Sequence, residues 1–378
     1  MKFMTPLAFF LISAKLLSSD FSTTDNAQSG NILGSGYTGV SRISDDTYSL
    51  FINPALSSIT NTENIISIKY GYTQAPYQEN TYTKNFGLAI NKRYDNWRFG
   101  AGILHQNTGL GFEYDWDNLI KSSKKLNHNY TSGINLSASY GTMFKVGIGT
   151  NLKYVYEGDE NNPSTTSDGL WAIDLGIFGS CQVLDKFKIS DQLSLDLSVN
   201  AGISKSNIAP KYDFKGIEYS SYSRMGYSIN TSMNYALKDE MIKLFGIEWY
   251  GEMFNTNFQN EFFDKTKVLK GLLTLDEKES IAGFKISAFE SISYMYGFFG
   301  NKEFMVDNSY GIAVSSNGVL KILNNFTDNE MIKWLNKNIA IEYIYAKVNY
   351  NYNPIPVYLE TDYYNHNLQI TFKYLNLF

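Results

Sequence analysis

Residues 193–203 read Leu-Ser-Leu-Asp-Leu-Ser-Val-Asn-Ala-Gly-Ile and decide the fold class of this chain. Apolar or small residues occupy every second position from Leu193 to Ile203, and Ser, Asp, Asn and Gly stand between them. Because successive side chains of a β-strand point to opposite faces of the sheet, this spacing predicts a strand with one apolar and one polar face. Its length also matches the roughly 9 to 11 residues with which a tilted strand crosses a bilayer.

The same alternation recurs along the chain and predicts about fourteen strands. They cover residues 64–73, 84–91, 97–106, 129–140, 143–156, 169–180, 192–203, 223–235, 242–252, 280–289, 291–299, 308–315, 339–350 and 366–375. An even number of strands is typical of a bacterial membrane barrel built from one chain. An open sheet of this size would leave long unpaired edges, so closure is favoured. We therefore expect an all-β fold, a transmembrane antiparallel β-barrel. The alternation fixes the number of strands to within one hairpin.

The connectors between these strands support the barrel. Those near 92–96, 141–142, 236–241 and 290 are short, whereas 107–128, 157–168, 204–222 and 253–279 are long. Short periplasmic turns that alternate with long extracellular loops are typical of outer-membrane barrels.

One long connector, 316–338, falls on the short-turn side and breaks this rule. Thr327 and Glu330 resemble a capping box, and Met331, Trp334 and Leu335 then share one helical face. We expect a periplasmic helical insertion that lies against the barrel base or the membrane edge.

Composition excludes several classes of protein. The 378 residues include 1 Cys and 3 His, too few for a disulfide-stapled domain or a multi-site zinc protein. The formal net charge is −5 and no basic run is present, so we expect no nucleic-acid partner. No motif indicates a catalytic residue, a metal site or a cofactor. Aromatic residues make up 16% of the chain, as aromatic girdles at two membrane interfaces require.

The two ends of the chain predict export. Residues 1–19 resemble a signal peptide, with Lys2 before an apolar stretch. The last predicted strand carries Phe372 and Tyr374 and is followed by Phe378, which resembles the signal read by the barrel-assembly machinery. Asn376 departs from that signal. The expected location is the bacterial outer membrane, with outer-membrane lipid as a partner.

Alternation also assigns a set of charged residues to the face that looks into the barrel. These are Lys69, Arg98, Lys145, Lys153, Asp174, Asp196, Glu248, Lys285, Glu342 and Lys373. Mixed charge suits a lumen that holds water or a plug. Ile65, Val155 and Phe178 fall on the same face and predict an apolar pocket in the lumen.

Residues 20–62 do not alternate. A glycine-rich stretch at 34–39, the pair Asp45 and Asp46, and the triplet Asn53, Pro54 and Ala55 precede the first strand. Together they resemble the N-terminal signature of the outer-membrane family that includes the fatty-acid transporter FadL and the type IX secretion proteins PorV and PorQ. Residues 152–178 are similar to the matching hairpin of PorV-like proteins.

The resemblance implies a fourteen-stranded barrel, here residues 63–378, whose N-terminal segment forms a plug or hatch in the lumen. It implies transport of hydrophobic small molecules across the outer membrane. The alternative is a PorV-like or PorQ-like secretion accessory that binds an exported protein cargo or a translocon through loops 107–128 and 253–279. A third reading is a structural surface antigen.

Overall fold

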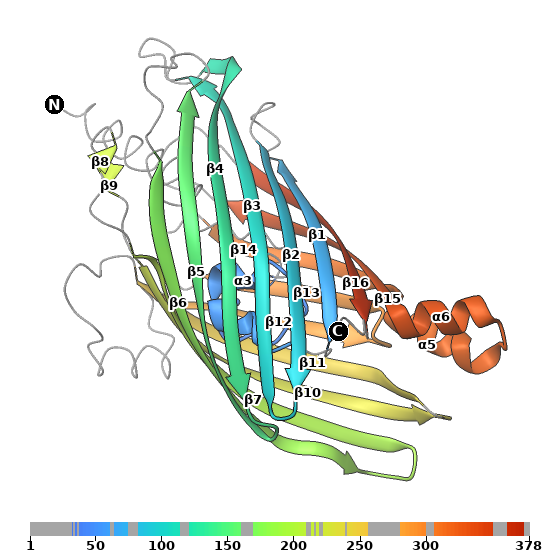
Figure 1. Cartoon of the computed structure of the whole chain (residues 1–378). Coiled ribbons are helices and arrows are strands. Elements are labelled where there is room, and N and C mark those ends of the chain that lie inside the picture. The colour runs from blue at the N-terminus through green and yellow to red at the C-terminus, as the bar shows by residue number, and fades with distance from the viewer. Residues whose placement is uncertain are drawn as a thin grey trace.

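Fourteen strands of this chain close into one barrel (Figure 1). The computed structural model describes residues 32, 35, 38–60, 64–74, 82–113, 121–159, 169–208, 213–214, 217–218, 222–238, 240–255, 280–299, 306–350 and 361–373. The barrel strands are β1 (Ile65–Gln74), β2 (Tyr82–Tyr94), β3 (Trp97–Glu113), β4 (Lys121–Tyr140), β5 (Phe144–Asp159), β6 (Leu170–Lys188), β7 (Leu193–Ile208), β10 (Tyr222–Leu237), β11 (Glu240–Asn255), β12 (Ser280–Ala288), β13 (Ile292–Phe299), β14 (Val306–Ser315), β15 (Ile339–Tyr350) and β16 (Thr361–Lys373). Two short strands, β8 (Asp213–Phe214) and β9 (Ile217–Glu218), form a separate ladder.

Each barrel strand pairs antiparallel with its neighbours, and β1 closes the barrel by pairing with β16 from Ile65↔Lys373 to Gln74↔Tyr364. The expected antiparallel barrel of fourteen strands is confirmed. Closure satisfies the backbone groups that an open edge would expose to lipid.

Several strands are longer than alternation predicts. Residues 107–113 and 121–128, expected to be part of a loop, belong to β3 and β4. Likewise β6 continues to Lys188. Beyond the apolar band the strands remain hydrogen-bonded to each other but have no lipid on their outer face, so apolar and polar side chains need not alternate there.

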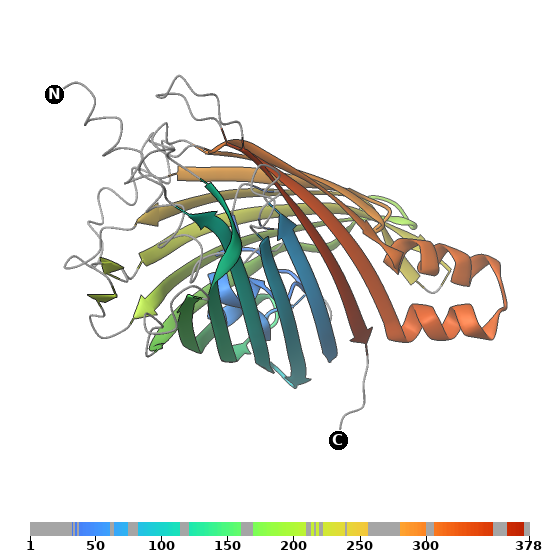
Figure 2. The ribbon, with the colours of Figure 1, turned by 90° about the horizontal axis from the view of Figure 1, so that it is seen from above.

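The connector between β14 and β15 contains two helices, α5 (Ser316–Phe326) and α6 (Glu330–Asn338). The predicted capping box at Thr327 and Glu330 is wrong. Ser315 caps α5, and Asn329 caps α6 by accepting hydrogen bonds from the amides of Met331 and Ile332. The break at 327–329 turns one predicted helix into a hairpin, which Figure 2 shows at the rim of the barrel.

Within the residues that the structure describes, no helix is both long and apolar enough to cross a membrane.

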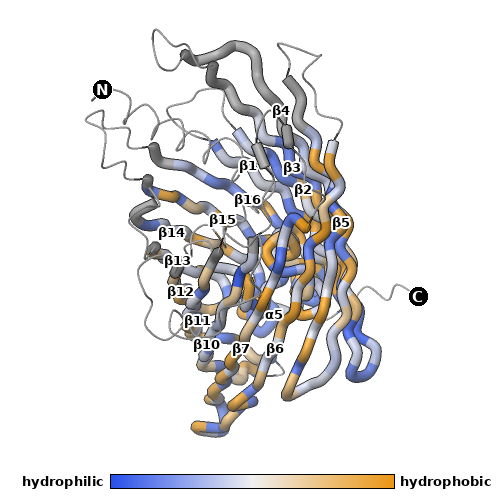
Figure 3. The backbone as a smooth tube through the Cα atoms, turned by 90° about the vertical axis from the view of Figure 1, so that its left-hand side faces the viewer, coloured by the Kyte–Doolittle hydropathy of each residue, from blue (hydrophilic) through white to orange (hydrophobic). Residues whose placement is uncertain are grey.

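The outer wall carries an aliphatic band between two aromatic belts. Leu136 and Ile148 in the band are 60% and 61% exposed. At the short-turn end the rings of Trp97 and Tyr140 lie 5.0 Å apart, and toward the loops Tyr130 meets Tyr156 at 6.1 Å. Figure 3 shows hydrophobic and hydrophilic residues alternating along these strands.

The spacing of the belts matches a bilayer. Tyr130 and Tyr140 are ten residues apart on β4, about 33 Å along a strand that rises about 3.3 Å per residue. A tilt of about 40° reduces this to roughly 25 Å, the height of the apolar band of membrane barrels. An apolar surface of this extent on a closed barrel is a lipid-facing surface.

Candidate functional site: the plugged lumen

The segment before β1 packs inside the barrel. It forms α3 (Ser49–Ile52) and the 3-10 helix η2 (Pro54–Ser58), seen in blue within the strands in Figure 1. Every residue from Asp46 to Ile59 is buried. We call residues 38–60 the plug. Their apolar side chains form two clusters inside the lumen, one with Leu104 of β3 and the other with Phe178 of β6.

The Asn53 side chain forms hydrogen bonds with two parts of the plug, at Ala55 and Val40, and with the barrel wall at Ile177. Pro54 follows it, and Asn53 is extended with φ −144° and ψ 108°, as a residue before proline prefers. Its side-chain oxygen accepts from the amide of Ala55 and caps η2. Its amide group donates to the carbonyls of Val40, at 2.8 Å, and Ile177, at 3.1 Å.

Inward-facing glycines let the plug backbone lie directly on the wall. A Cβ atom on Gly149 of β5 would stand 2.3 Å from the carbonyl oxygen of Pro54, and one on Gly176 of β6 would stand 2.0 Å from the Asn53 side chain. Gly100 of β3 is equally close to Ser57. Any larger residue at these positions would displace η2.

Asparagines on β4 and β2 satisfy buried carbonyls of the plug. Asn135 donates to the carbonyl of Pro54 at 3.1 Å, and Asn91 donates to that of Ser57 at 3.0 Å. Since buried carbonyls cost free energy when unpaired, these residues allow η2 to be buried without a regular sheet.

Asp46 and Lys69 form a fully buried ion pair between the plug and β1. The Lys69 ammonium lies 2.7 Å from the Asp46 carboxylate, and both side chains are at most 2% exposed. The same ammonium lies 4.8 Å from the ring centre of Tyr48. Burial raises the pKa of the Tyr48 hydroxyl above its usual range, with Asp46 contributing, so this ring is neutral.

Arg42 reaches the opposite wall of the barrel. Its guanidinium lies 5.0 Å from the ring centre of Tyr250 and 4.0 Å from the carboxylate of Glu248, both on β11. Burial favours loss of the charge, but Tyr250, Glu248 and Asp46 outweigh it and raise the pKa of Arg42. The plug therefore brings a permanent positive charge to β11.

Glu252 holds the plug backbone, although sequence reasoning did not select it. Its carboxylate accepts hydrogen bonds from the amides of Gly39, at 2.8 Å, and Val40, at 3.1 Å. The other oxygen pairs with Arg224 of β10 at 3.0 Å, and both side chains are 2% exposed. Glu252 is four residues after Glu248 on β11, so both side chains face the lumen, and alternation could have identified Glu252 as well.

A second buried ion pair belongs to the wall. Lys153 lies 2.8 Å from Asp174 and donates to Asn207 at 2.7 Å. Asp174 also accepts from the backbone amide of Asn207, where the β6–β7 register shifts. Asn151 connects this cluster to the plug by donating to Asp174 and to the carbonyl of Leu50.

Arg98 and Asp196 support the backbone of the short-turn end. Arg98 donates to the carbonyl of Gly141 at 2.8 Å. Asp196 accepts from the amide of Lys186 at 2.6 Å and from the side chain of Asn234 at 2.7 Å. Neither contact involves the plug.

The other predicted charges are spread around the inner wall. Lys145 stands opposite Ser180, Lys285 opposite Glu248, and Glu342 opposite Gln369. Lys373, at the end of β16, donates to Asn317 of α5 at 2.7 Å. Two of the charges selected from the sequence pair directly with plug charges, Lys69 with Asp46 and Glu248 with Arg42.

The remaining predicted residues have separate places. Asp45 accepts a hydrogen bond from Gln369 through its backbone carbonyl, at 2.7 Å. Phe372 lies on β16 opposite Ile66 and Ile339. Tyr374, Phe378 and the signal segment 1–19 lie outside the described residues.

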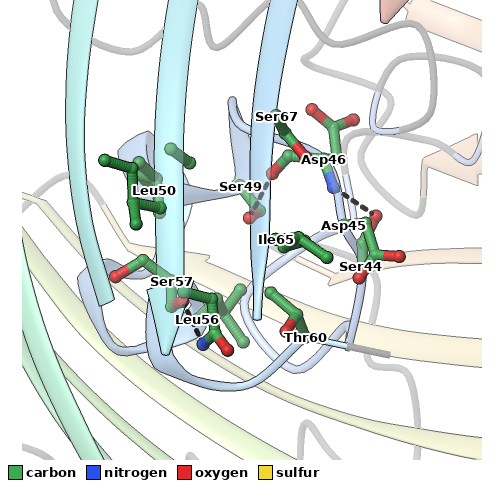
Figure 4. Close-up of a pocket in the computed structure, with 13 residues that line it drawn as sticks. Ser44, Asp45, Asp46, Ser49, Leu50, Leu56, Ser57, Thr60, Ile65 and Ser67 are labelled. Carbon is green, nitrogen blue, oxygen red and sulfur yellow. Dashed lines mark hydrogen bonds between the residues drawn. The ribbon is translucent and has the colours of Figure 1, made fainter. Parts of the chain in front are cut away.

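The expected apolar residues of the lumen are buried, and two of them lie beside the plug. Phe178 packs on Ala55, Leu56 and Ile59. Ile65 lines a cavity of about 10 Å³ between the plug and β1–β2 (Figure 4), which has room for about one water molecule. In this conformation the plug fills the lumen beside these strands.

A separate apolar strip lies on the inner wall of β13–β15. Met295, Ala313 and Ile344 form one cluster and are at most 2% exposed. Ala346 and Val348 continue the same face of β15 toward the loop end, both buried. Apolar side chains at inward positions differ from the polar interior of a water-filled porin.

Comparison with known proteins gives matches among solved structures alone; no family model and no curated protein matches the chain. The chain is similar to the Pseudomonas putida toluene transporter TodX, with 9% identity over 91% of this chain and 96% of that one, at a TM-score of 0.44. It is also similar to a Pseudomonas aeruginosa FadL homologue (10% identity, 91% and 98% coverage, TM-score 0.41) and to the CymD monoaromatic hydrocarbon channel (9%, 91% and 98%, TM-score 0.43). Such values describe a likeness in architecture.

Proposed function

We propose that this chain is a bacterial outer-membrane channel for hydrophobic small molecules, which residues 20–62 close as a lumenal plug or hatch. The lipid-facing band and its aromatic belts support the membrane location. The lumen is the passage, and the plug must leave it or rearrange within it before a solute can pass. The chain's role is binding and passage, without a chemical step.

The observation that carries the choice of cargo is the apolar strip of Met295, Ala313 and Ile344. Its side chains lie on the inner wall, where a channel for ions or sugars would place polar groups. A hydrophobic solute gains roughly 25 cal/mol for each Å² of apolar surface that leaves water, so such a strip favours it over a charged solute.

Uptake by proteoliposomes tests this proposal. The purified protein in vesicles whose outer leaflet is lipopolysaccharide should admit labelled toluene, used as a small apolar probe, faster than protein-free vesicles of the same lipid, and should not admit a charged sugar. Met295→Gln should slow toluene entry several-fold because it places an amide in the strip. Met295→Leu, which keeps the strip apolar, is the matched control. Equal rates for the two variants would contradict the role of the strip.

The secretion-accessory alternative remains a prediction. Its expected contact surface overlaps the loop-end extensions of β3 and β4. These extensions lie on the loop side of the aromatic belt that contains Tyr130. A pull-down from mild detergent, analysed for proteins and lipids together, separates the two functions. Recovery of a large exported protein in stoichiometric amounts would favour the accessory and oppose the channel, whereas recovery of a hydrophobic small molecule without such a protein would favour the channel.

A further inference from the structure

The α5–α6 hairpin is bound to the barrel rim by its polar side. Lys321 of α5 pairs with Glu290 at 2.7 Å and donates to the carbonyl of Met241 at 3.0 Å. Asn324 of α5 and Asn336 of α6 both donate to Glu240 at the start of β11. The hairpin is therefore attached to the β10–β11 and β12–β13 turns by hydrogen bonds and an ion pair.

Gly318 sets how closely α5 approaches this rim. A Cβ atom there would lie 1.5 Å from the carbonyl oxygen of Phe289, in the β12–β13 turn. The next residue, Val319, donates its amide to Ser291 at 3.0 Å. These contacts fix the rotation of α5 about its axis and decide which side chains point away from the barrel.

The side that points away is apolar. Val319, Leu323 and Phe326 follow at i, i+4 and i+7, so they share one face of α5, and Phe326 is 78% exposed. On α6, Met331 and Trp334 are 69% and 56% exposed. A helix packed on a soluble protein buries its apolar face and exposes its polar one. This hairpin has the reverse arrangement.

The exposed apolar side chains continue the lipid-facing wall. Ile292 and Val314, at the short-turn ends of β13 and β14, are 58% and 51% exposed. Ile341 on β15 is 45% exposed. The amide of Ile341 donates to Ser316, the first residue of α5. In both views the hairpin projects sideways from the rim, away from the mouth of the barrel (Figures 1 and 2).

We propose that the α5–α6 hairpin lies in the membrane interface on the short-turn side, with Val319, Leu323, Phe326, Met331 and Trp334 among the lipid acyl chains. The partner is a glycerophospholipid surface. Continuity with the lipid-facing wall argues for it, and so do the lysines of α6, since Lys333 and Lys337 are exposed beside Trp334. A long lysine side chain can lie along apolar surface with its ammonium at the lipid phosphates.

This arrangement would anchor the rim between β11 and β16 to one leaflet. It is independent of what passes through the lumen, because the contacts that hold the hairpin, described above, are with the ends of the strands and with Lys373. The proposal therefore stands or falls separately from the channel function.

Spin-label accessibility in vesicles tests it on the full chain. Cys181, the one cysteine of the sequence, is first replaced (Cys181→Ser). Single cysteines at Phe326→Cys, Val319→Cys and Trp334→Cys are then labelled with a nitroxide, and the protein is placed in phosphatidylethanolamine–phosphatidylglycerol vesicles. We expect all three labels to collide more with oxygen than with a water-soluble nickel complex, at a depth of about 5–10 Å below the phosphates.

Asp328→Cys, in the connection between the two helices, is the matched control. The Asp328 side chain is fully exposed, and its label should collide mainly with the nickel complex. The proposal is overturned if the labels at Phe326, Val319 and Trp334 are as accessible to nickel as the control, because the apolar face would then contact water or a soluble partner. Each replaced side chain is at least half exposed, so the barrel does not depend on it for packing.

Discussion

The plug is held by two different kinds of contact on its two sides. Over β2–β6, residues 53–58 lie on glycines and are bound by asparagine amides; we call this the packed side. Over β1, β10 and β11, residues 39–48 meet buried charges; we call this the charged side. The packed side is fixed by shape, whereas the charged side depends on pairs of opposite charge.

The difference separates what positions the plug from what can release it. Close packing of backbone on backbone has one geometry, so the packed side sets the register of the plug in the lumen. A buried ion pair is costly to break but gives little net stability compared with an apolar pair. The charged side is therefore where a change in charge or solvent would most affect docking.

The largest effect is expected from Asp46→Asn, which removes one member of the Asp46–Lys69 pair. Lys69 would be left buried opposite a neutral group, so docking of the plug should weaken by about 3–5 kcal/mol. Faster hydrogen exchange of residues 38–60 measures this. The double variant Asp46→Leu with Lys69→Met should restore most of the protection, because no unpaired charge remains. Equal exchange in the single variant and the parent would show that the pair does not hold the plug.

Gly149→Ala tests the packed side. Its methyl group would meet the carbonyl of Pro54, and we expect a loss of about 1–3 kcal/mol, typical of overpacking. Gly179→Ala is the control on the neighbouring strand, because a Cβ at Gly179 meets nothing within 4 Å. Thermal unfolding and exchange of residues 53–58 measure the difference. Two indistinguishable variants would mean that η2 has room to move away from the wall.

Asn53→Ser tests the residue that joins the two sides. Serine keeps an acceptor for the amide of Ala55 but loses the bonds to Val40 and Ile177, at a cost of about 1–2 kcal/mol. Asn329→Ser is the control, since that residue only caps α6 and serine caps helices comparably well. The comparison fails if both changes have the same effect on thermal unfolding.

The smallest effect is expected from Lys333→Met, which removes an exposed ion pair. Lys333 lies 3.6 Å from Asp328 and 3.8 Å from Glu330, in contacts open to solvent. Exposed pairs contribute little, so unfolding should change by less than about 0.5 kcal/mol. A loss as large as that of Asp46→Asn would show that burial does not decide the strength of these pairs.

Alternation along the chain was sufficient to predict the strands and their faces. Lys69, Lys153 and Asp174 were assigned to the lumen because a strand has a period of two, and each is fully buried there. The extended conformation of Asn53 followed from Pro54 alone. These are local properties, since they depend on a residue and its chain neighbours.

Partners across the lumen could not be predicted in this way. Asp46 and Lys69 are 23 residues apart, and Val40 and Glu252 are 212 apart. No local pattern distinguishes Lys69, which binds the plug, from Lys145, which has the same parity on another strand. Gly133 and Gly149 likewise both face the lumen by alternation, yet a Cβ at Gly149 would meet Pro54 of η2, whereas one at Gly133 would meet Lys153 of the wall.

The sequence by itself determined that this chain forms a membrane barrel, because side-chain direction, strand length and turn length are all set by neighbours in the chain. The tertiary structure decided which inward residues hold the plug, and it rotated α5 so that Phe326 faces away from the barrel. Those outcomes depend on closing the sheet and seating the plug against it, which bring together atoms whose separation in the sequence carries no information about their distance in space.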